Sequence, residues 1–517
     1  MIKLTNRTAR NVLASFFGWG WTAVMGLVCF PIYVRFLGIE AFGLVSFFTV
    51  LQSTLVPLDL GLSTALSKEL AGLSAQKGKE LQMRELVRTL EVIYWAVAAV
   101  VGGGVLLLAP WISRYWVHAD HVSLPDVRQA VALMGVALTL VWPYSLYSRG
   151  VMGLQQHVRL NVLNSILITA RYLGAVPVIW WAPSVRAFFI WQIVAYGVHT
   201  GVVALLLWGS LPTATNPARF RTERLKELWR FVAGLSGISA TAVVLAQMDR
   251  IILSKFLPLD LFGYYSLAAL AAGSMMFLSE PVYAALLPRL SELVILQDFK
   301  GIRKVYHGGC QVLSAVVFPA MAIVCLYSSE VLSAWTGSRE VVEHSHGILS
   351  LLIVAATLAA LNRVPFALQL AHGWTGLAFR INLLAIVIGL PLMIIAAKWG
   401  DPASVALIVV LVNAAYTVCN LTVMHRALLS GDRARWYVED VGYPLAVALL
   451  IAGAGRWLFP ATLSRPLTVA ALAAVASATL LASLFTAAPI REWVRRWMSG
   501  SESAEPHPAD DGGGRQP

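Results

Sequence analysis

Long apolar runs dominate the sequence and constrain its fold more than any other feature. A helix needs roughly 20 mostly apolar residues to cross a bilayer, and about fourteen runs of this length are present. They lie near residues 11–34, 41–63, 89–112, 128–149, 160–182, 186–208, 231–257, 263–287, 306–328, 347–371, 380–398, 404–426, 441–459 and 466–486. With 58% hydrophobic and 13% charged residues, the chain has more apolar surface than a soluble core would bury. Because the runs lack the period-two alternation of barrel strands, they predict an all-α polytopic membrane protein.

The distribution of lysine and arginine predicts which ends of the spans face the cytoplasm. About 27 of the 39 Lys and Arg residues fall in alternate connecting segments, which the positive-inside rule assigns to the cytoplasm. These segments are 1–10, 64–88, 149–159, 209–230, 288–305, 372–380, 426–440 and 487–517. Both termini are therefore expected to be cytoplasmic. The formal charge of +12 is scattered between apolar spans, so we expect no nucleic-acid partner.

The order of the spans predicts the domain organisation. We expect an N-lobe of six spans, a cytoplasmic linker, a C-lobe of six spans, two further spans, an interfacial basic helix and a disordered tail. Their ranges are 1–208, 209–230, 231–428, 429–486, 487–498 and 499–517. In the interfacial segment, Ile490, Trp493, Val494 and Trp497 share one helical face, while three arginines lie elsewhere. This spacing is typical of a helix lying on the inner leaflet.

An internal repeat relates the two predicted lobes. Residues 33–46 read YVRFLGIEAFGLVS and residues 253–266 read LSKFLPLDLFGYYS. Position 255 minus position 35 gives an offset of 220, which pairs Arg35 with Lys255 without a gap. The offset also pairs Phe36 with Phe256, Leu37 with Leu257, Glu40 with Asp260, Phe42 with Phe262, Gly43 with Gly263 and Ser46 with Ser266. Both copies would start inside, and such parallel repeats place a substrate path between two halves that rock in alternating access.

These two stretches, extended to FPIYVRFLGIEAFGLVSFF and MDRIILSKFLPLDLFGYYSLA, resemble the Wzx-type polysaccharide-transporter branch of the multidrug/oligosaccharidyl-lipid/polysaccharide (MOP, MATE-like) exporter superfamily. The resemblance implies a flippase that carries undecaprenyl-pyrophosphate-linked oligosaccharide repeat units across the bacterial inner membrane. These units would supply O-antigen, capsule or exopolysaccharide biosynthesis. It further implies a central cationic cavity and coupling to a proton or sodium gradient, with no other cofactor. Membrane lipids, a polymerase and a chain-length regulator are the partners it suggests.

Arginines inside the spans are the candidate substrate-binding cations. Arg171, Arg250 and Arg363 lie mid-span, and Arg149 lies nearer the inner boundary. A charge at this depth costs roughly 2.5–3.5 kcal/mol on insertion scales, so it usually faces a cavity or a partner. Guanidinium stays charged when partly desolvated and binds phosphate oxygens in a fork. The alternative is that each arginine forms an internal ion pair with another helix.

Amides at seven-residue spacing form polar stripes on three predicted helices. Each stripe would present its members on one face. The pairs are Asn164 with Arg171, Asn362 with Gln369, and Asn413 with Asn420. Such stripes could line a wet path and bind sugar hydroxyls, or they could join helices through hydrogen bonds.

Three carboxylates are candidates for binding the coupling ion. Asp59 follows Pro57 in the second span, and Glu280 precedes Pro281 in the eighth, so both spans are expected to be broken there. Asp249 is the third candidate. A structural kink with a paired carboxylate is the alternative for each.

Several functions remain open from the sequence. A small-molecule or drug cation antiporter and a lipid II flippase are alternatives within the same superfamily. A membrane polysaccharide polymerase or ligase is the alternative from another class, although such an enzyme would need a sizeable outer loop and the outer loops here are short. No catalytic motif or Walker sequence is present, and the pair His344 and His346 lacks further metal ligands. We therefore expect neither enzyme activity nor a metal site.

Overall fold

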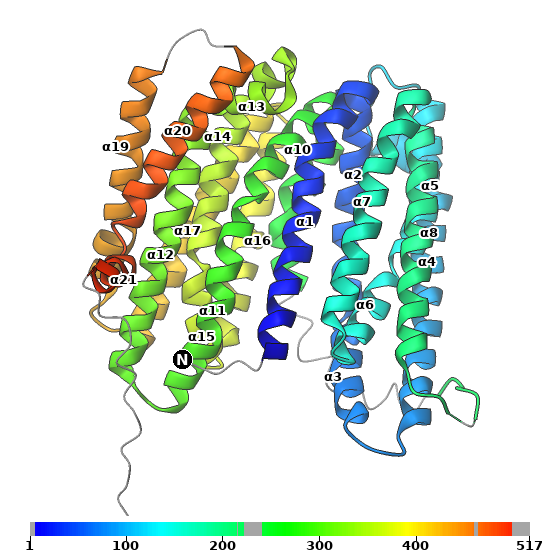
Figure 1. Ribbon diagram of the computed structural model, residues 1–517. Helices are drawn as coiled ribbons and strands as arrows, with labels where there is room; N and C mark the ends of the chain where they lie inside the picture. Colours follow the sequence, from blue (N-terminus) through cyan, green and yellow to red (C-terminus); the bar gives the residue numbers. More distant parts are fainter. Residues whose placement is uncertain (1–5, 215, 222–239, 460–463, 499–517) are drawn as a thin grey trace, which may run out of the picture. The chain divides into compact units, whose positions relative to one another are not determined.

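The computed structural model describes residues 6–214, 216–221, 240–459 and 464–498. Its first elements are α1 (Asn6–Leu37), α2 (Ile39–Leu55), η1 (Val56–Asp59), α3 (Leu62–Ser74), α4 (Glu80–Tyr115), α5 (Leu124–Val141), α6 (Tyr144–Gly153), α7 (His157–Trp181) and α8 (Val185–Ser210) (Figure 1). A helix over 240–256 follows, and then α10 (Leu259–Gly273), α11 (Met275–Ile295), α12 (Phe299–Leu326), α13 (Ser328–Thr336), α14 (Arg339–Leu361) and α15 (Arg363–Ala371). The last elements are α16 (Thr375–Ala397), α17 (Pro402–Leu428), α18 (Arg433–Arg435), η2 (Trp436–Gly442), α19 (Tyr443–Leu458), α20 (Arg465–Leu484) and α21 (Ala488–Met498).

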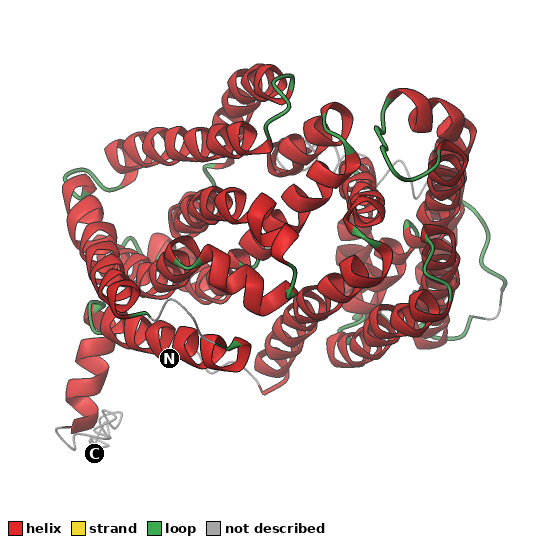
Figure 2. Ribbon diagram, turned by 90° about the horizontal axis from the view of Figure 1, so that it is seen from above, coloured by secondary structure: helices red, strands yellow, loops and turns green. Residues whose placement is uncertain are grey.

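The predicted all-α membrane fold is confirmed. Among the described residues, thirteen helical segments are long and apolar enough to cross a membrane. The seventh predicted span, 231–257, lies partly outside the described residues, and residues 240–256 of it are helical. Figure 2 shows helices and loops but no strand in the part of the chain that the structure describes.

The chain divides into two compact units. Unit 1 comprises residues 1–277, 327–359 and 374–420, and unit 2 comprises residues 278–326, 360–373 and 421–517. The predicted lobe boundaries stay a prediction. Part of the predicted linker and the predicted disordered tail, 499–517, lie outside the described residues. The predicted interfacial segment is helical as α21, and its place on the membrane surface also stays a prediction.

Helix boundaries recur at the offset found in the sequence. Trp142 and Pro143 separate α5 from α6, and Asn362, which lies 220 residues after Trp142, separates α14 from α15. The starts of α4, α7 and α8 are matched by the starts of α12, α16 and α17 at separations within about three residues of 220. The repeat therefore extends over whole spans, well beyond the short stretches that revealed it.

The second span is broken where the sequence predicted. After α2 the chain passes through the 3₁₀ turn η1, and Leu60 and Gly61 then adopt positive φ angles of 50° and 81° before α3 begins. Proline in η1 lacks the N–H that would continue the α-helical ladder, so the turn ends α2.

The predicted break of the eighth span at Pro281 is wrong. Helix α11 runs through Pro281 and Pro288, and the interruption lies earlier, at Ser274. The N–H and the hydroxyl of Ser274 both donate to the Ala271 carbonyl, at 3.3 and 2.6 Å. This three-residue closure replaces the regular four-residue pattern and ends α10.

Helices α2 and α10 cross closely within unit 1, at the glycines of the repeat. A Cβ on Gly43 would collide with the Leu259 carbonyl oxygen, and a Cβ on Gly263 would lie 2.6 Å from the Ile39 carbonyl oxygen. Gly43 and Gly263 are equivalent in the repeat, as are Ile39 and Leu259. Such reciprocal contacts are what a local twofold relation produces. The repeated Phe-Gly pair is therefore explained by the close approach of two backbones.

Candidate functional site

A cavity of about 480 Å³ lies within unit 1. Its walls come from α1, α7, the helix over 240–256, α10 and the start of α11. The lining residues are Thr22, Ala23, Gly26, Leu27, Tyr172, Arg250, Ala269, Leu270, Gly273, Ser274 and Phe277. The break between α10 and α11 is part of the wall, as expected for irregular backbone at membrane depth, which is tolerated where it lines a cavity. The cavity has an apolar wall with a few polar groups, the usual character of a ligand site.

Arg250 is the one charged residue among the described residues that line this cavity. Its Nε is buried and has no hydrogen-bond partner in the described part of the chain. The neighbouring Asp249 forms no ion pair with Arg250, and its Oδ2 accepts a hydrogen bond from the Tyr265 hydroxyl at 2.6 Å. The guanidinium is therefore available for an anion that enters the cavity.

Arg171 lies in an aromatic cluster next to the cavity. Its guanidinium carbon lies 4.9 Å from the ring centroid of Tyr172 and 4.6 Å from that of Tyr196. No carboxylate among the described residues pairs with Arg171, so cation–π contacts take the place of an ion pair. Tyr172 itself lines the cavity and is fixed from behind, since the Tyr33 hydroxyl donates to its carbonyl at 2.6 Å. The structure thus connects Arg171 to the cavity wall through Tyr172.

Arg363 has a different environment, in unit 2. It forms an ion pair with Glu280, and its guanidinium lies 5.1 Å from the Tyr283 ring centroid. One candidate cation and one candidate ion-binding carboxylate therefore contact each other. The fourth candidate cation, Arg149, is exposed.

The amide stripes mostly make contacts within and between helices. Asn164 donates to the Tyr144 hydroxyl at 2.8 Å, and its Oδ1 lies 3.0 Å from His199 Nε2. Asn413 donates to the Val409 carbonyl one turn earlier, at 2.9 Å. The remaining stripe residues, Asn362, Gln369 and Asn420, are buried. None of the stripe residues lines the cavity described above, so their role in substrate binding stays a prediction.

Asp59 lies in the 3₁₀ turn that breaks the second span. Its carboxylate accepts a hydrogen bond from the Tyr94 hydroxyl and one from the Ser63 hydroxyl at 2.9 Å. Asp59 and Asp249 are thus both held by hydroxyl donors, whereas Glu280 is held by a cation. Ion binding at these three carboxylates stays a prediction.

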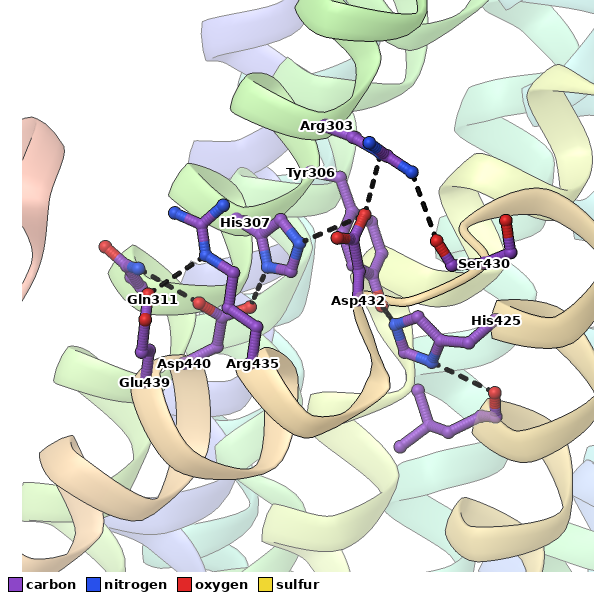
Figure 3. Close-up of polar contacts among 11 residues, drawn as sticks. Arg303, Tyr306, His307, Gln311, His425, Ser430, Asp432, Arg435, Glu439 and Asp440 are labelled. Atoms are coloured by element: carbon purple, nitrogen blue, oxygen red, sulfur yellow. Dashed lines mark hydrogen bonds and ion pairs between the residues drawn. The ribbon is translucent and has the colours of Figure 1, made fainter.

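Sequence reasoning missed two sets of residues. Tyr172 and Thr22 line the cavity, but aromatic and hydroxyl residues inside an apolar run carry no specific signal. A polar cluster in unit 2 joins His307, Gln311 and Asp440 (Figure 3). Asp440 is fully buried although it directly precedes a predicted span, so the sequence placed it in a loop.

Comparison with known proteins identifies similar families and folds. Residues 32–340 match the family described as polysaccharide biosynthesis protein. Among solved structures, the lipid II flippase MurJ in an inward closed conformation has a TM-score of 0.70 at 10% identity, covering 95% of this chain and 100% of that chain. An inward-facing MATE-family multidrug resistance transporter of the MOP superfamily has a TM-score of 0.66 at 12% identity, covering 78% and 94%.

A MOP superfamily transporter from Pyrococcus furiosus is also similar, with a TM-score of 0.54 at 12% identity and coverage of 82% and 95%. No curated protein sequence matches. Identities this low show a shared fold only, whereas the family match covers more than half of the chain.

Proposed function

The chain belongs to the polysaccharide biosynthesis protein family and has the fold of MOP-superfamily transporters and flippases, and from this premise we propose its substrate. The cargo is an undecaprenyl-pyrophosphate-linked oligosaccharide repeat unit, carried across the bacterial inner membrane by alternating access. The unit supplies surface polysaccharide such as O-antigen, capsule or exopolysaccharide. A polymerase and a chain-length regulator would then act on the delivered unit.

The observation that carries this proposal is the guanidinium of Arg250 in the cavity of unit 1. It lacks a carboxylate partner among the described residues, and its Nε is buried without a hydrogen bond. Burying such a charge is costly unless a ligand supplies the missing acceptor. A pyrophosphate supplies several acceptor oxygens and the opposite charge.

The same observation disfavours a drug cation antiporter. A cationic substrate would need a carboxylate on the cavity wall, and no acidic residue lies among the described residues that line the cavity. A lipid II flippase would present the same pyrophosphate chemistry, so the test must compare lipid-linked oligosaccharides with lipid II.

Coupling to a proton or sodium gradient is part of the proposal. Asp59 and Asp249 are the favoured ion-binding groups because each carboxylate is held by hydroxyl groups and lacks a basic partner among the described residues. Glu280 is less favoured because Arg363 neutralises it. Asp59→Asn and Asp249→Asn should each reduce gradient-driven transport, and unchanged gradient dependence in both would contradict this part of the proposal.

The test of the substrate uses the purified full-length protein in proteoliposomes. Undecaprenyl-pyrophosphate-linked oligosaccharide is incorporated in both leaflets, and a glycosidase added outside digests only the outer pool. With the wild-type protein, digestion should proceed past the outer half towards completion. Arg250→Gln should slow the digestion of the inner pool about tenfold or more, because a charge-assisted hydrogen bond contributes about 1.5–3 kcal/mol.

A matched control uses another arginine. Arg339, whose side chain is 95% exposed at the start of α14, lies outside the cavity, so Arg339→Gln should flip lipid at the wild-type rate. Wild-type flipping by Arg250→Gln would remove the main support for the proposal. Transport of lipid II in preference to the oligosaccharide lipid would instead support a lipid II flippase. Transport of a cationic dye alone would instead support a drug cation antiporter.

A further inference from the structure

A buried polar cluster in unit 2 lies between α12 and η2, away from the groups used above (Figure 3). Element η2 is a π-helix of seven residues, an uncommon conformation that is frequent at functional sites. It carries Asp440, whose side chain is completely buried. A carboxylate in this position needs strong compensation from its neighbours.

Two side chains of α12 provide donors to Asp440. His307 Nδ1 lies 2.5 Å from Asp440 Oδ2, and Gln311 Nε2 donates to Asp440 Oδ1 at 2.9 Å. The His307 side chain is only 3% exposed. Both oxygens of the carboxylate are therefore bound by one helix.

The other side of the imidazole faces a second carboxylate. His307 Nε2 is buried and has no hydrogen-bond partner among the described residues, and its nearest charged atom is Asp432 Oδ2 at 3.8 Å. Arg303 Nε binds the same Asp432 oxygen at 2.9 Å. With a protonated His307, two cations balance two carboxylates. With a neutral His307, the cluster holds one uncompensated negative charge.

No other described group in the cluster provides the missing positive charge. His425 Nδ1 lies 3.0 Å from the Leu421 carbonyl, so it donates there, and Nε2 lies 3.2 Å from the Tyr306 hydroxyl oxygen, so both ring nitrogens are engaged away from Asp432 and Asp440. Arg435 is engaged by Glu439 at 2.9 Å. Lys300, Lys304 and Cys310 lie on α12 itself, and both lysines are exposed. On the elements packed against α12, the remaining titratable or charged groups whose side chains are described are Arg363, His372, Tyr437, Tyr443, Arg456, Arg465, Arg491, Glu492 and Arg495. Of these, Arg363 is paired with Glu280, Arg465 starts α20, and Arg491, Glu492 and Arg495 are exposed.

Gln311 connects this cluster to the C-terminal helix. Its Oε1 accepts a hydrogen bond from the Ala488 N–H at 3.0 Å, in the first turn of α21. The amide thus bridges Asp440 on η2 and the start of α21, with α12 between them. A change at Asp440 would reach α21 through one side chain.

We infer that His307, Asp432 and Asp440 form a proton-binding site that locks η2 and α21 onto α12. The bound proton resides on His307, between the two carboxylates. Asp432 is 15% exposed and Arg303 49% exposed, so the proton exchanges with solvent on this side. Loss of the proton leaves excess negative charge in a buried site, which loosens η2 and releases its connection to α21.

Hydrogen–deuterium exchange of the full-length protein in lipid nanodiscs tests this site. Exchange is followed in peptides covering 433–442 and 485–492 at about pH 5.5 and about pH 8.5, values that bracket histidine titration. Labelling times are scaled for the chemical effect of pH. The wild-type peptides should lose protection about tenfold or more at the higher pH. Equal protection at both pH values would overturn the inference.

Three variants sharpen the result. His307→Gln should expose both peptides at either pH, since glutamine donates a hydrogen bond to Asp440 but carries no positive charge. Asp432→Asn should keep them protected at either pH, because it removes the excess negative charge that follows deprotonation. His346→Gln, at an exposed position of α14, should respond like the wild type. A wild-type pH response in His307→Gln or in Asp432→Asn would also overturn the inference.

Discussion

The three mid-span arginines show at the residue scale that charge in an apolar run has more than one use. Arg250 faces a cavity without a carboxylate among the described residues, Arg171 lies on two tyrosine rings, and Arg363 is paired with Glu280. The sequence predicted all three to lie within membrane spans. It did not reveal that Tyr196 and Glu280 are partners of Arg171 and Arg363, because these two residues come from other helices.

Removing the partner of Arg363 should destabilise the protein. Glu280→Gln leaves a partly buried guanidinium without its counter-ion, at a cost of about 1–3 kcal/mol. Adding Arg363→Gln should restore much of the loss, since the unpaired charge is then gone. Thermal unfolding in detergent, compared as Tm values, measures both effects.

The Arg289–Glu292 pair on α11 provides the control, since its side chains are 49% and 40% exposed. Breaking it with Glu292→Gln should cost less than about 1 kcal/mol. Equal Tm losses in Glu280→Gln and Glu292→Gln would show that the Arg363–Glu280 pair contributes no more than a surface contact.

The crossing of α2 and α10 shows at the element scale what the repeated Phe-Gly motif does. The two glycines bring the backbones of equivalent helices into contact, so the motif is a packing requirement. In the first turn of α2, just before the crossing, the Glu40 carboxylate accepts hydrogen bonds from the N–H groups of Asp120, His121 and Val122 at 2.6 to 3.1 Å. Glu40 thereby attaches the loop after α4 to the start of α2.

A methyl group at this crossing should separate the two helices. Gly43→Ala places a Cβ against the Leu259 carbonyl, and backbone atoms move away only at a cost of about 1–3 kcal/mol. Gly104→Ala is the matched control, since a Cβ there meets nothing within 4 Å and helix propensity favours alanine. The Tm of Gly43→Ala should be well below that of the wild type. The Tm of Gly104→Ala should equal or exceed that of the wild type. The reverse order would contradict the close crossing.

Asp401 caps the start of α17 and makes that helix end sensitive to acid. Desolvation raises the pKa of Asp401, but hydrogen bonds from the Ser404 hydroxyl and from the N–H groups of Ala403 and Ser404 outweigh it, so the pKa lies below its usual value. The cap therefore stabilises the protein above the unfolded-state pKa. This contribution is lost as the pH falls through the folded-state pKa.

Asp401→Ala should consequently lower stability by about 0.5–2 kcal/mol near neutral pH. The Tm difference from the wild type should shrink below about pH 4, where the wild-type carboxylate also loses its charge. A difference that stays constant from neutral pH to about pH 3 would show that the charge of Asp401 plays no part in the cap.

For the whole molecule, the sequence predicted those features of the fold that depend on local composition and on the internal repeat. Apolar runs located the spans, and the offset of 220 residues also relates the breaks at Trp142 and Asn362, which the sequence did not predict. Contacts between distant helices were not predictable. His307 and Asp440 are 133 residues apart, and no periodic pattern connects a histidine within a span to an aspartate before another.

The proposed activity predicts the sidedness of lipid-linked sugars in cells. A strain that lacks this protein and any redundant carrier should accumulate the oligosaccharide lipid in the inner leaflet, because its polar head cannot cross the bilayer unaided. The wild-type gene should restore outer-leaflet lipid, measured by its reaction with an impermeant glycan-labelling reagent. Arg339→Gln should restore it as well, whereas Arg250→Gln should not.

A drug antiporter would leave sidedness unchanged in the deletion strain, and a polymerase or ligase would leave unpolymerised units already exposed outside. Normal outer-leaflet labelling in the deletion strain would therefore refute the flippase proposal, since the substrate would then cross without the cavity that contains Arg250.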